Sequence, residues 1–171
     1  MVGHPSGGRR SEPLYTAEER RRRDQSRWTI VQGVLAPLQF VVFLISVTLI
    51  LRYLATGEGP FAAAVSVVVK TALLYAIMIT GSIWEKEVFG RYLFAPAFYW
   101  EDVVSMLVLA LHTAYLAAWT TGAVEPRGQM FIALAAYAAY FINAAQFLLK
   151  LRSARLDQDM RMRGALPEAA K

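Results

Sequence analysis

The chain contains no cysteine among its 171 residues. Disulfides, iron–sulfur clusters, thiolate nucleophiles and cysteine-based zinc sites are therefore excluded. Charge is scarce over most of the length, because acidic and basic side chains gather near the two ends and in one central segment. The first 27 residues have no apolar core, so a cleaved signal peptide is not expected there. These absences leave the long uncharged stretches as the main feature of the sequence.

The uncharged stretches are strongly apolar. Hydrophobic residues make up 56% of the chain and the mean hydropathy is +0.36, which is too apolar for a soluble domain of this length. Four runs approach or exceed the ~20 residues needed to cross a bilayer. They cover residues 29–54, 61–84, 103–120 and 130–149. We therefore predict an all-α polytopic membrane protein, a bundle of four transmembrane helices. A short N-terminal amphipathic helix should precede it, capped by Thr16 and Glu19.

The rest of the chain follows from composition and charge. Residues 1–13 are rich in Gly, Pro, Ser and Arg and are predicted to be disordered, residues 14–155 form the membrane domain, and residues 156–171 form a cytoplasmic tail. Of the 18 lysines and arginines, 15 lie on the side of the two termini and the central segment, only Arg52 and Arg127 lie on the side of the two short turns, and Lys70 lies inside a run. The positive-inside rule then predicts an inner-membrane, multi-pass protein with both termini cytoplasmic. Basic residues arranged in this way give no indication of nucleic-acid binding.

The segment from Trp84 to Asp102, between the second and third runs, combines carboxylates with many aromatic rings. A connection that only joined two helices would need fewer of either. The segment therefore indicates a site at the membrane edge, on the cytoplasmic side. The simpler alternative is that each carboxylate faces water or pairs with Lys86 or Arg91. We expect that for Glu87 and Asp102.

Helical spacing connects this segment with the membrane interior. Glu101, Ser105, His112 and either Tyr115 or Trp119 share one face of the third helix. The second helix has a comparable face that ends in a carboxylate. This face comprises Thr71, Tyr75, Met78, Ser82 and Glu85, with Lys70 at its edge. Two such faces would form a pocket with an apolar depth and an acidic mouth, suited to a flat amphipathic ligand.

A carboxyl group at a hydrophobic border can serve as a general acid, because desolvation disfavours its charged form. Glu101 is the first candidate for this role and Glu85 the second. Trp84 and Trp100, next to these glutamates in the sequence, are candidates for the aromatic walls.

Polar residues inside the runs need partners. Lys70 lies about ten residues into the second run, roughly 14 Å deep, so it should face the bundle interior as a structural partner or a functional group. His112 is either a hydrogen-bonded packing residue or one axial ligand to a metal carried by a macrocycle. No site for a metal held by the protein alone is expected. Gln32, Gln39 and Ser46 recur every seven residues and favour interhelical hydrogen bonds over substrate contact.

Several long stretches resemble a known family, the vinyl-bacteriochlorophyllide hydratases of bacteriochlorophyll synthesis in photosynthetic bacteria. They include LYTAEERRRRDQSRWTIVQGVLAPLQFVVFL, ITGSIWEKEVFGRYLFAPAFYWEDVVSM and QMFIALAAYAAYFINAAQFLLKLR, and the resemblance covers roughly residues 14–155. It implies a hydro-lyase that adds water across the ring-A vinyl group of a magnesium chlorin to give a hydroxyethyl group. No cofactor is implied, since the magnesium belongs to the substrate.

The resemblance provides no catalytic residues, so the site assignments come from the residues themselves. Glu101 and Glu85 are the catalytic candidates. The substrate-binding candidates are His112, Lys70, Ser105, Trp84, Trp100 and Tyr115. The expected partners are the magnesium chlorin, the lipid bilayer and neighbouring pigment-biosynthesis enzymes.

Two other classes of function also have support in the sequence. A non-catalytic membrane protein that binds a pigment or scaffolds an assembly would explain His112 and the aromatics, but not the group of carboxylates. A small transporter is suggested by Lys70, yet the sequence has no internal repeat or paired broken helices. Incubation with a vinyl chlorin separates a binder, which shifts a spectrum, from an enzyme, which adds the mass of one water.

Overall fold

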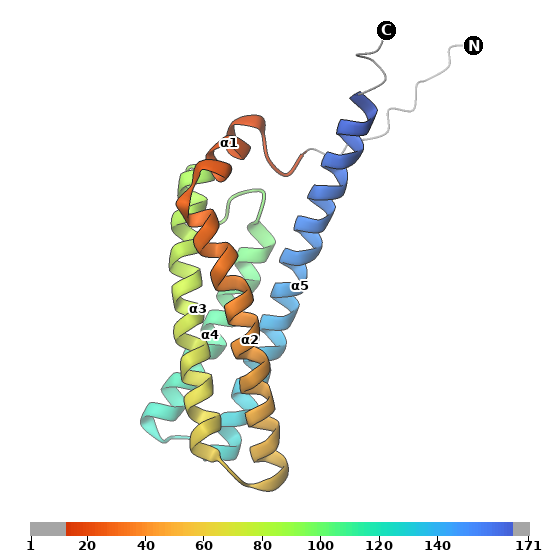
Figure 1. The fold of residues 1–171 in the computed structure, drawn as a ribbon. Helices are drawn as coiled ribbons and strands as arrows, with labels where there is room; N and C mark the ends of the chain where they lie inside the picture. The colour runs from red at the N-terminus through yellow and green to blue at the C-terminus, as the bar shows by residue number, and fades with distance from the viewer. Residues whose placement is uncertain (1–12, 166–171) are drawn as a thin grey trace, which may run out of the picture.

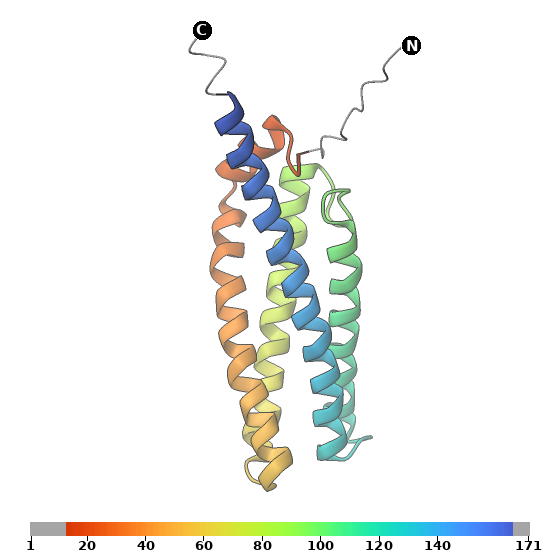
Figure 2. The same ribbon diagram turned by 90° about the vertical axis from the view of Figure 1, so that its right-hand side faces the viewer.

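Five helices make up the computed structural model, which describes residues 13–165 (Figures 1 and 2). They are α1 (Ala17–Gln25), α2 (Arg27–Thr56), α3 (Pro60–Phe89), α4 (Tyr99–Thr121) and α5 (Pro126–Ala165). Helices α2 to α5 are each long and apolar enough to cross a membrane. The prediction of an all-α, multi-pass membrane protein with four spans is therefore confirmed. The disorder predicted for residues 1–12 lies outside the described residues.

The helix boundaries follow from local chemistry. At α1, Thr16 Oγ1 accepts from the Glu19 amide at 3.2 Å and Glu19 Oε2 accepts from the Thr16 amide at 2.8 Å, so the predicted capping box is confirmed. Helix α3 begins at Pro60 and ends before Gly90, whose φ of +84° is the left-handed conformation that ends many helices.

Two helices extend beyond the apolar runs that predicted them. Helix α4 begins at Tyr99 rather than residue 103, because Glu101 and Asp102 lie in its first turn, where negative charge is favourable. Helix α5 continues past residue 149 to Ala165, so the predicted tail starts as helix; residues 166–171 lie outside the described part.

The bundle consists of two helical hairpins. Helix α2 packs mainly against α3 and α4 mainly against α5, and the two hairpins contact each other at far fewer places. The loop of residues 90–98, α1 and the final turns of α5 lie at one end, which we call the loop end (Figures 1 and 2). The turns that join α2 to α3 and α4 to α5 lie at the other end. The position of each predicted site residue along its helix therefore gives its depth in the bundle, measured from the loop end.

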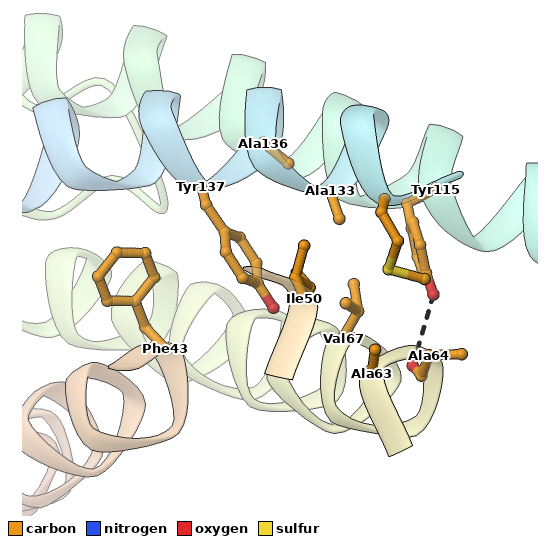
Figure 3. Close-up of a cluster of buried hydrophobic side chains, with 10 residues drawn as sticks. Phe43, Ile50, Ala63, Ala64, Val67, Tyr115, Ala133, Ala136 and Tyr137 are labelled. Atoms are coloured by element: carbon orange, nitrogen blue, oxygen red, sulfur yellow. Dashed lines mark hydrogen bonds between the residues drawn. The ribbon is translucent and has the colours of Figure 1, made fainter. Parts of the chain in front are cut away.

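Small side chains allow the helices to approach closely toward the end of the bundle opposite the loop end (Figure 3). Ala63 and Ala133 are completely buried, as are Ile50 and Val67. Between membrane helices, close backbone approach of this kind is a principal source of association. Tyr115 is also fully buried and its hydroxyl donates to the Ala64 carbonyl across the hairpins at 3.5 Å.

Polar side chains join the helices at three depths. Gln32 Nε2 donates to Thr80 Oγ1 at 2.8 Å, and Gln39 Oε1 accepts from Lys70 Nζ. Ser46 Oγ lies 2.6 Å from the Tyr137 hydroxyl. The predicted interhelical role of Gln32, Gln39 and Ser46 is confirmed.

Candidate active site

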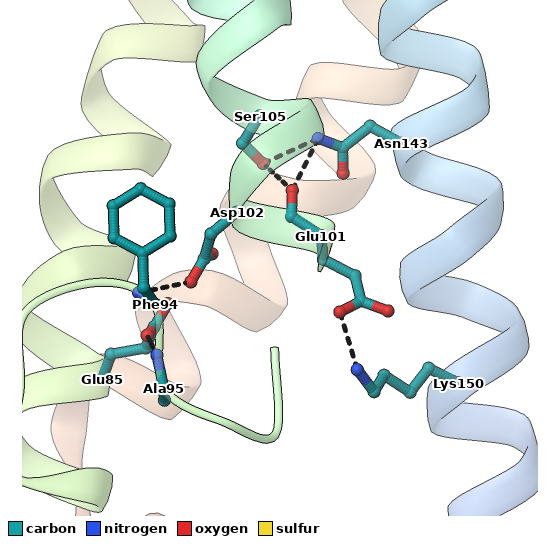
Figure 4. Close-up of polar contacts among 8 residues, drawn as sticks. All are labelled: Glu85, Phe94, Ala95, Glu101, Asp102, Ser105, Asn143 and Lys150. Atoms are coloured by element: carbon teal, nitrogen blue, oxygen red, sulfur yellow. Dashed lines mark hydrogen bonds and ion pairs between the residues drawn. The ribbon is translucent and has the colours of Figure 1, made fainter. Parts of the chain in front are cut away.

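A cluster of buried carboxyl groups lies at the loop end (Figure 4). We call it the border centre; it consists of Glu85, Glu101, Asp102, Asn143 and Lys150. Glu85, Glu101 and Asp102 are only 6%, 7% and 3% exposed as whole residues. Asp102 was expected to face solvent or Arg91, and that prediction is wrong, because the first turn of α4 directs this carboxyl group toward the loop. Buried carboxyl groups need hydrogen-bond donors or counter-charges, and here these are two loop amides and Lys150.

Consecutive loop amides hold two of the carboxyl groups. The Phe94 amide donates to Asp102 Oδ2 at 2.8 Å, and the Ala95 amide donates to Glu85 Oε2 at 3.3 Å (Figure 4). The Glu85 and Asp102 carboxyl groups are therefore neighbours, held by adjacent residues of one loop. Two neighbouring buried carboxylates repel each other, so the charged form of one of them is disfavoured. This pair can therefore store one proton in a buried position.

The loop adopts an unusual conformation in order to present those amides. Phe94 has a φ of +58°, and among the described residues it is the one non-glycine with a positive φ. A bulky residue in this region of φ costs about 1–3 kcal/mol and persists only where the surroundings impose it. Here the imposed feature is the hydrogen bond from the Phe94 amide to Asp102.

Glu101 has a different environment from its two neighbours. Its Oε2 lies 2.6 Å from Lys150 Nζ, which is 28% exposed, in the last part of α5 (Figure 4). Asn143 Nδ2 donates to Ser105 Oγ at 2.6 Å and to the Glu101 carbonyl at 3.3 Å, which fixes the start of α4 against α5. The ion pair holds Glu101 as a carboxylate. In this form it can accept a proton but has none to donate.

Five aromatic rings lie at the same end and pack on one another. This aromatic cluster consists of Tyr15, Trp84, Phe89, Phe98 and Phe147. Phe98 is its centre, only 2% exposed, with Lys150 Nζ 5.1 Å from its ring centroid. Burial raises the pKa of the Tyr15 phenol, which keeps this ring uncharged. The cluster excludes water beside the carboxyl groups.

The two tryptophans predicted as walls have different positions. Trp84 packs edge-on against Phe98, with centroids 5.9 Å apart, and its Nε1 donates to Thr29 Oγ1 at 2.9 Å. Trp100 is 69% exposed and packs against Tyr99 on the outer surface of α4. It follows that Phe98, which the sequence did not single out, takes the position expected for Trp100.

A second polar group lies deeper in the bundle. We call it the inner centre; it consists of Gln39, Lys70, His112, Tyr137 and Tyr140. Lys70 is fully buried, so its predicted inward orientation is confirmed; its Nζ donates to Gln39 Oε1 and lies 3.6 Å from the Tyr140 ring centroid. The His112 ring lies 5.7 Å from that of Tyr137. Ser105 and Tyr115, on the same face of α4, are buried as expected.

Only one of the two ring nitrogens of His112 has a hydrogen-bond partner among the described residues. Its Nδ1 lies 2.8 Å from the Val108 carbonyl, which can only accept, so Nδ1 carries the proton. Its Nε2 is buried without a hydrogen-bond partner among the described residues. A buried nitrogen lone pair of this kind is compatible with a ligand or with a packing role.

The two centres are separated along the bundle axis. The 11 residues from Glu101 to His112 rise ~16 Å along α4. The predicted site residues therefore form two groups rather than one pocket. Sequence reasoning missed Lys150, Phe98 and the role of Asp102. The seven-residue spacing of Asn143 and Lys150, which puts both on one face of α5, is a signal that could have indicated Lys150.

Comparison with known proteins gives a consistent result. The sequence profile of the 2-vinyl bacteriochlorophyllide hydratase family matches residues 15–153. A protein of that name from Cereibacter sphaeroides is 68% identical over 147 residues, covering 85% of this chain and 91% of its own length. One from Rhodobacter capsulatus is 65% identical over 143 residues, covering 84% of this chain and 83% of its own. No solved structure matches. The chain belongs to the 2-vinyl bacteriochlorophyllide hydratase family.

Proposed function

We propose that this chain adds water across the vinyl group of 2-vinyl bacteriochlorophyllide at the border centre, as a hydro-lyase of bacteriochlorophyll biosynthesis. The hydratase activity follows from family membership and high identity to the relatives of that name. One structural observation supports the location of the reaction. Two neighbouring buried carboxyl groups and an ion-paired carboxylate lie together beside the aromatic cluster.

Hydration of a vinyl group needs an acid, a base and a water. The Glu85–Asp102 pair donates its proton to the terminal vinyl carbon; the π electrons form the new C–H bond and leave a cation beside the macrocycle. The Glu101 carboxylate and the aromatic cluster stabilise that cation. Water then bonds to the cationic carbon, and Glu101 accepts the proton that the water loses. Return of this proton to the pair completes the cycle, and only substrate and water are consumed.

This assignment uses both glutamates predicted from the sequence but changes their order. Glu101 was the first candidate for proton donor and Glu85 the second. The 2.6 Å contact with Lys150 makes Glu101 the better acceptor, and the contact with Asp102 makes Glu85 the better donor.

The size of the macrocycle limits the role of His112. Summed bond lengths place the magnesium at most about 8 Å from the terminal vinyl carbon. A chlorin with its magnesium on His112 would therefore hold its vinyl group about 8 Å short of Glu101, given the ~16 Å rise between the two residues. Axial ligation by His112 and protonation at the border centre exclude each other for one bound substrate. We place the vinyl group at the border centre.

The decisive test of function is incubation of the purified protein with a 2-vinyl magnesium chlorin. We expect a product heavier by one water, with a hydroxyethyl group in place of the vinyl group. Mass spectrometry measures the conversion, and boiled protein provides the control. A spectral shift with unchanged mass would instead establish the non-catalytic pigment binder.

We also propose that the loop end faces the cytoplasm in the inner membrane, on the evidence of the biased lysine and arginine distribution. The chain has no cysteine of its own, so single cysteines can report topology. Cysteines at Glu58 and Glu125 should react with a membrane-impermeant thiol reagent in intact cells, and a cysteine at Arg91 should react only after lysis. The opposite pattern would place the border centre on the periplasmic side.

A further inference from the structure

Lys70 is a buried amine with no acidic partner among the described residues. Its side chain is fully buried, and no carboxylate among the described residues lies within ion-pair distance of it. A lysine ammonium has three donors, and Gln39 Oε1 is the one hydrogen-bond acceptor found for it among the described residues. The Tyr140 ring face adds a cation–π contact at 3.6 Å. A buried cation of this kind ordinarily has an anionic or strongly polar partner.

The mechanism described above leaves the inner centre without a role. Tyr137 and Tyr140 lie one turn apart on α5, so the side chains that contact His112 and Lys70 form one strip. Tyr140, whose ring the Lys70 ammonium contacts, lies 10 residues before Lys150, a rise of ~15 Å along α5. This is about twice the upper limit of ~8 Å from a chlorin's magnesium to its terminal vinyl carbon. A macrocycle with its vinyl group at the border centre therefore reaches the inner centre with its opposite edge.

We propose that Lys70 binds an oxygen acceptor on the edge of the macrocycle opposite the vinyl group and so sets the orientation of the substrate. This inference rests on the proposed function. The acceptor is either a carboxylate or a ring ketone, since a chlorophyllide carries both on the half of the ring away from the vinyl group. In the proposed orientation the flat ring lies between the hairpins α2–α3 and α4–α5, which contact each other at fewer places than the helices within each hairpin do.

Electrostatics favours this orientation over the reverse one. Protonation of the vinyl group creates positive charge on the adjacent carbon, and a lysine ammonium nearby would destabilise it. The anionic border centre stabilises the same charge. The polarity of the bundle, with carboxylates at the loop end and a cation inside, therefore matches the polarity of the reacting ring.

The test is a binding titration, followed by absorbance, of full-length protein with three magnesium chlorins: the free acid, its methyl ester, and an analogue with the ring ketone reduced to a methylene. Parent, Lys70→Met and Lys70→Arg proteins are compared. We expect Lys70→Met to weaken binding of the free acid roughly 10- to 100-fold, the usual effect of losing a hydrogen bond to a charged group. Lys70→Arg should retain most of the affinity, because it keeps the charge.

The analogues identify the acceptor. If it is the carboxylate, Lys70→Met should have little effect on the ester; if it is the ketone, little effect on the reduced analogue. An equal effect on all three ligands, or none on any, would overturn the inference, whereas hydration by the parent protein would still support the proposed function. His112→Phe adds a second check. A selective loss of affinity for the magnesium form over the metal-free chlorin would place the ring centre at His112 and also overturn the proposed orientation.

Discussion

Replacement of Glu85 by glutamine should reduce turnover by ~10²–10⁴-fold, the usual contribution of a general acid. Glutamine keeps the size of the side chain but has no acidic proton to donate. Asp102→Asn should produce a loss of the same order, because either carboxyl group can carry the shared proton. The affinity for the vinyl chlorin should change little. The measurement is the ratio of hydroxyethyl to vinyl pigment formed by membranes at equal protein.

Glu87→Gln provides a matched control. Glu87 lies two residues along the same helix, but it is exposed and outside the border centre, where Ser26 donates to it. This variant should retain parental turnover. Near-parental conversion by both Glu85→Gln and Asp102→Asn would eliminate the pair as the proton donor and return Glu101 to that role.

Loss of the partner of Glu101 should affect stability as well as turnover. Lys150→Met leaves a carboxylate that is 7% exposed without its counter-charge. Because Lys150 itself is 28% exposed, we expect a loss of about 1–3 kcal/mol in unfolding free energy, below the ~3–5 kcal/mol typical of fully buried pairs. Adding Glu101→Gln should restore much of this stability but not the turnover. Thermal unfolding in detergent measures the first effect and pigment conversion the second.

Lys86→Met serves as the control for this pair, since Lys86 is exposed and donates to the Gly90 carbonyl rather than to a carboxylate. Lys86→Met should change neither the unfolding free energy nor the turnover appreciably. If the double variant Glu101→Gln/Lys150→Met remained as unstable as Lys150→Met alone, the destabilisation would come from lost packing of the lysine stem and not from an unpaired charge.

Deuterium exchange distinguishes the donor from the acceptor. In heavy water the donor delivers deuterium to the terminal vinyl carbon. If the resulting cation then loses a protium from that carbon instead of reacting with water, the vinyl substrate is regenerated with the deuterium in it. Glu85→Gln should suppress this labelling together with hydration. Glu101→Gln should slow hydration while labelling of recovered substrate continues, because the cation still forms. Suppressed labelling in Glu101→Gln and retained labelling in Glu85→Gln would reverse the two roles.

The extent of each helix and the residues that share its buried face could be predicted from the sequence. The four spans, the capping box of Thr16 and the buried face of Glu101, Ser105, His112 and Tyr115 all depend on a repeat of 3.6 residues or on contacts within one turn. The depth of Lys70 follows from its position in the second run, and its burial follows from the cost of exposing a charge to lipid.

Only the tertiary structure decided how those faces meet. Glu101 and Lys150 are 49 residues apart, and the spacing of Asn143 and Lys150 puts both on one face of α5 without indicating which helix that face meets. Helix α5 brings Lys150 to the border centre because the helix continues beyond the apolar run. Asp102 joins Glu85 because the left-handed Phe94 turns two loop amides inward. Such pairings depend on the rotation of each helix about its axis and on the path of the loop. Both are fixed by packing between distant segments, which no local pattern records.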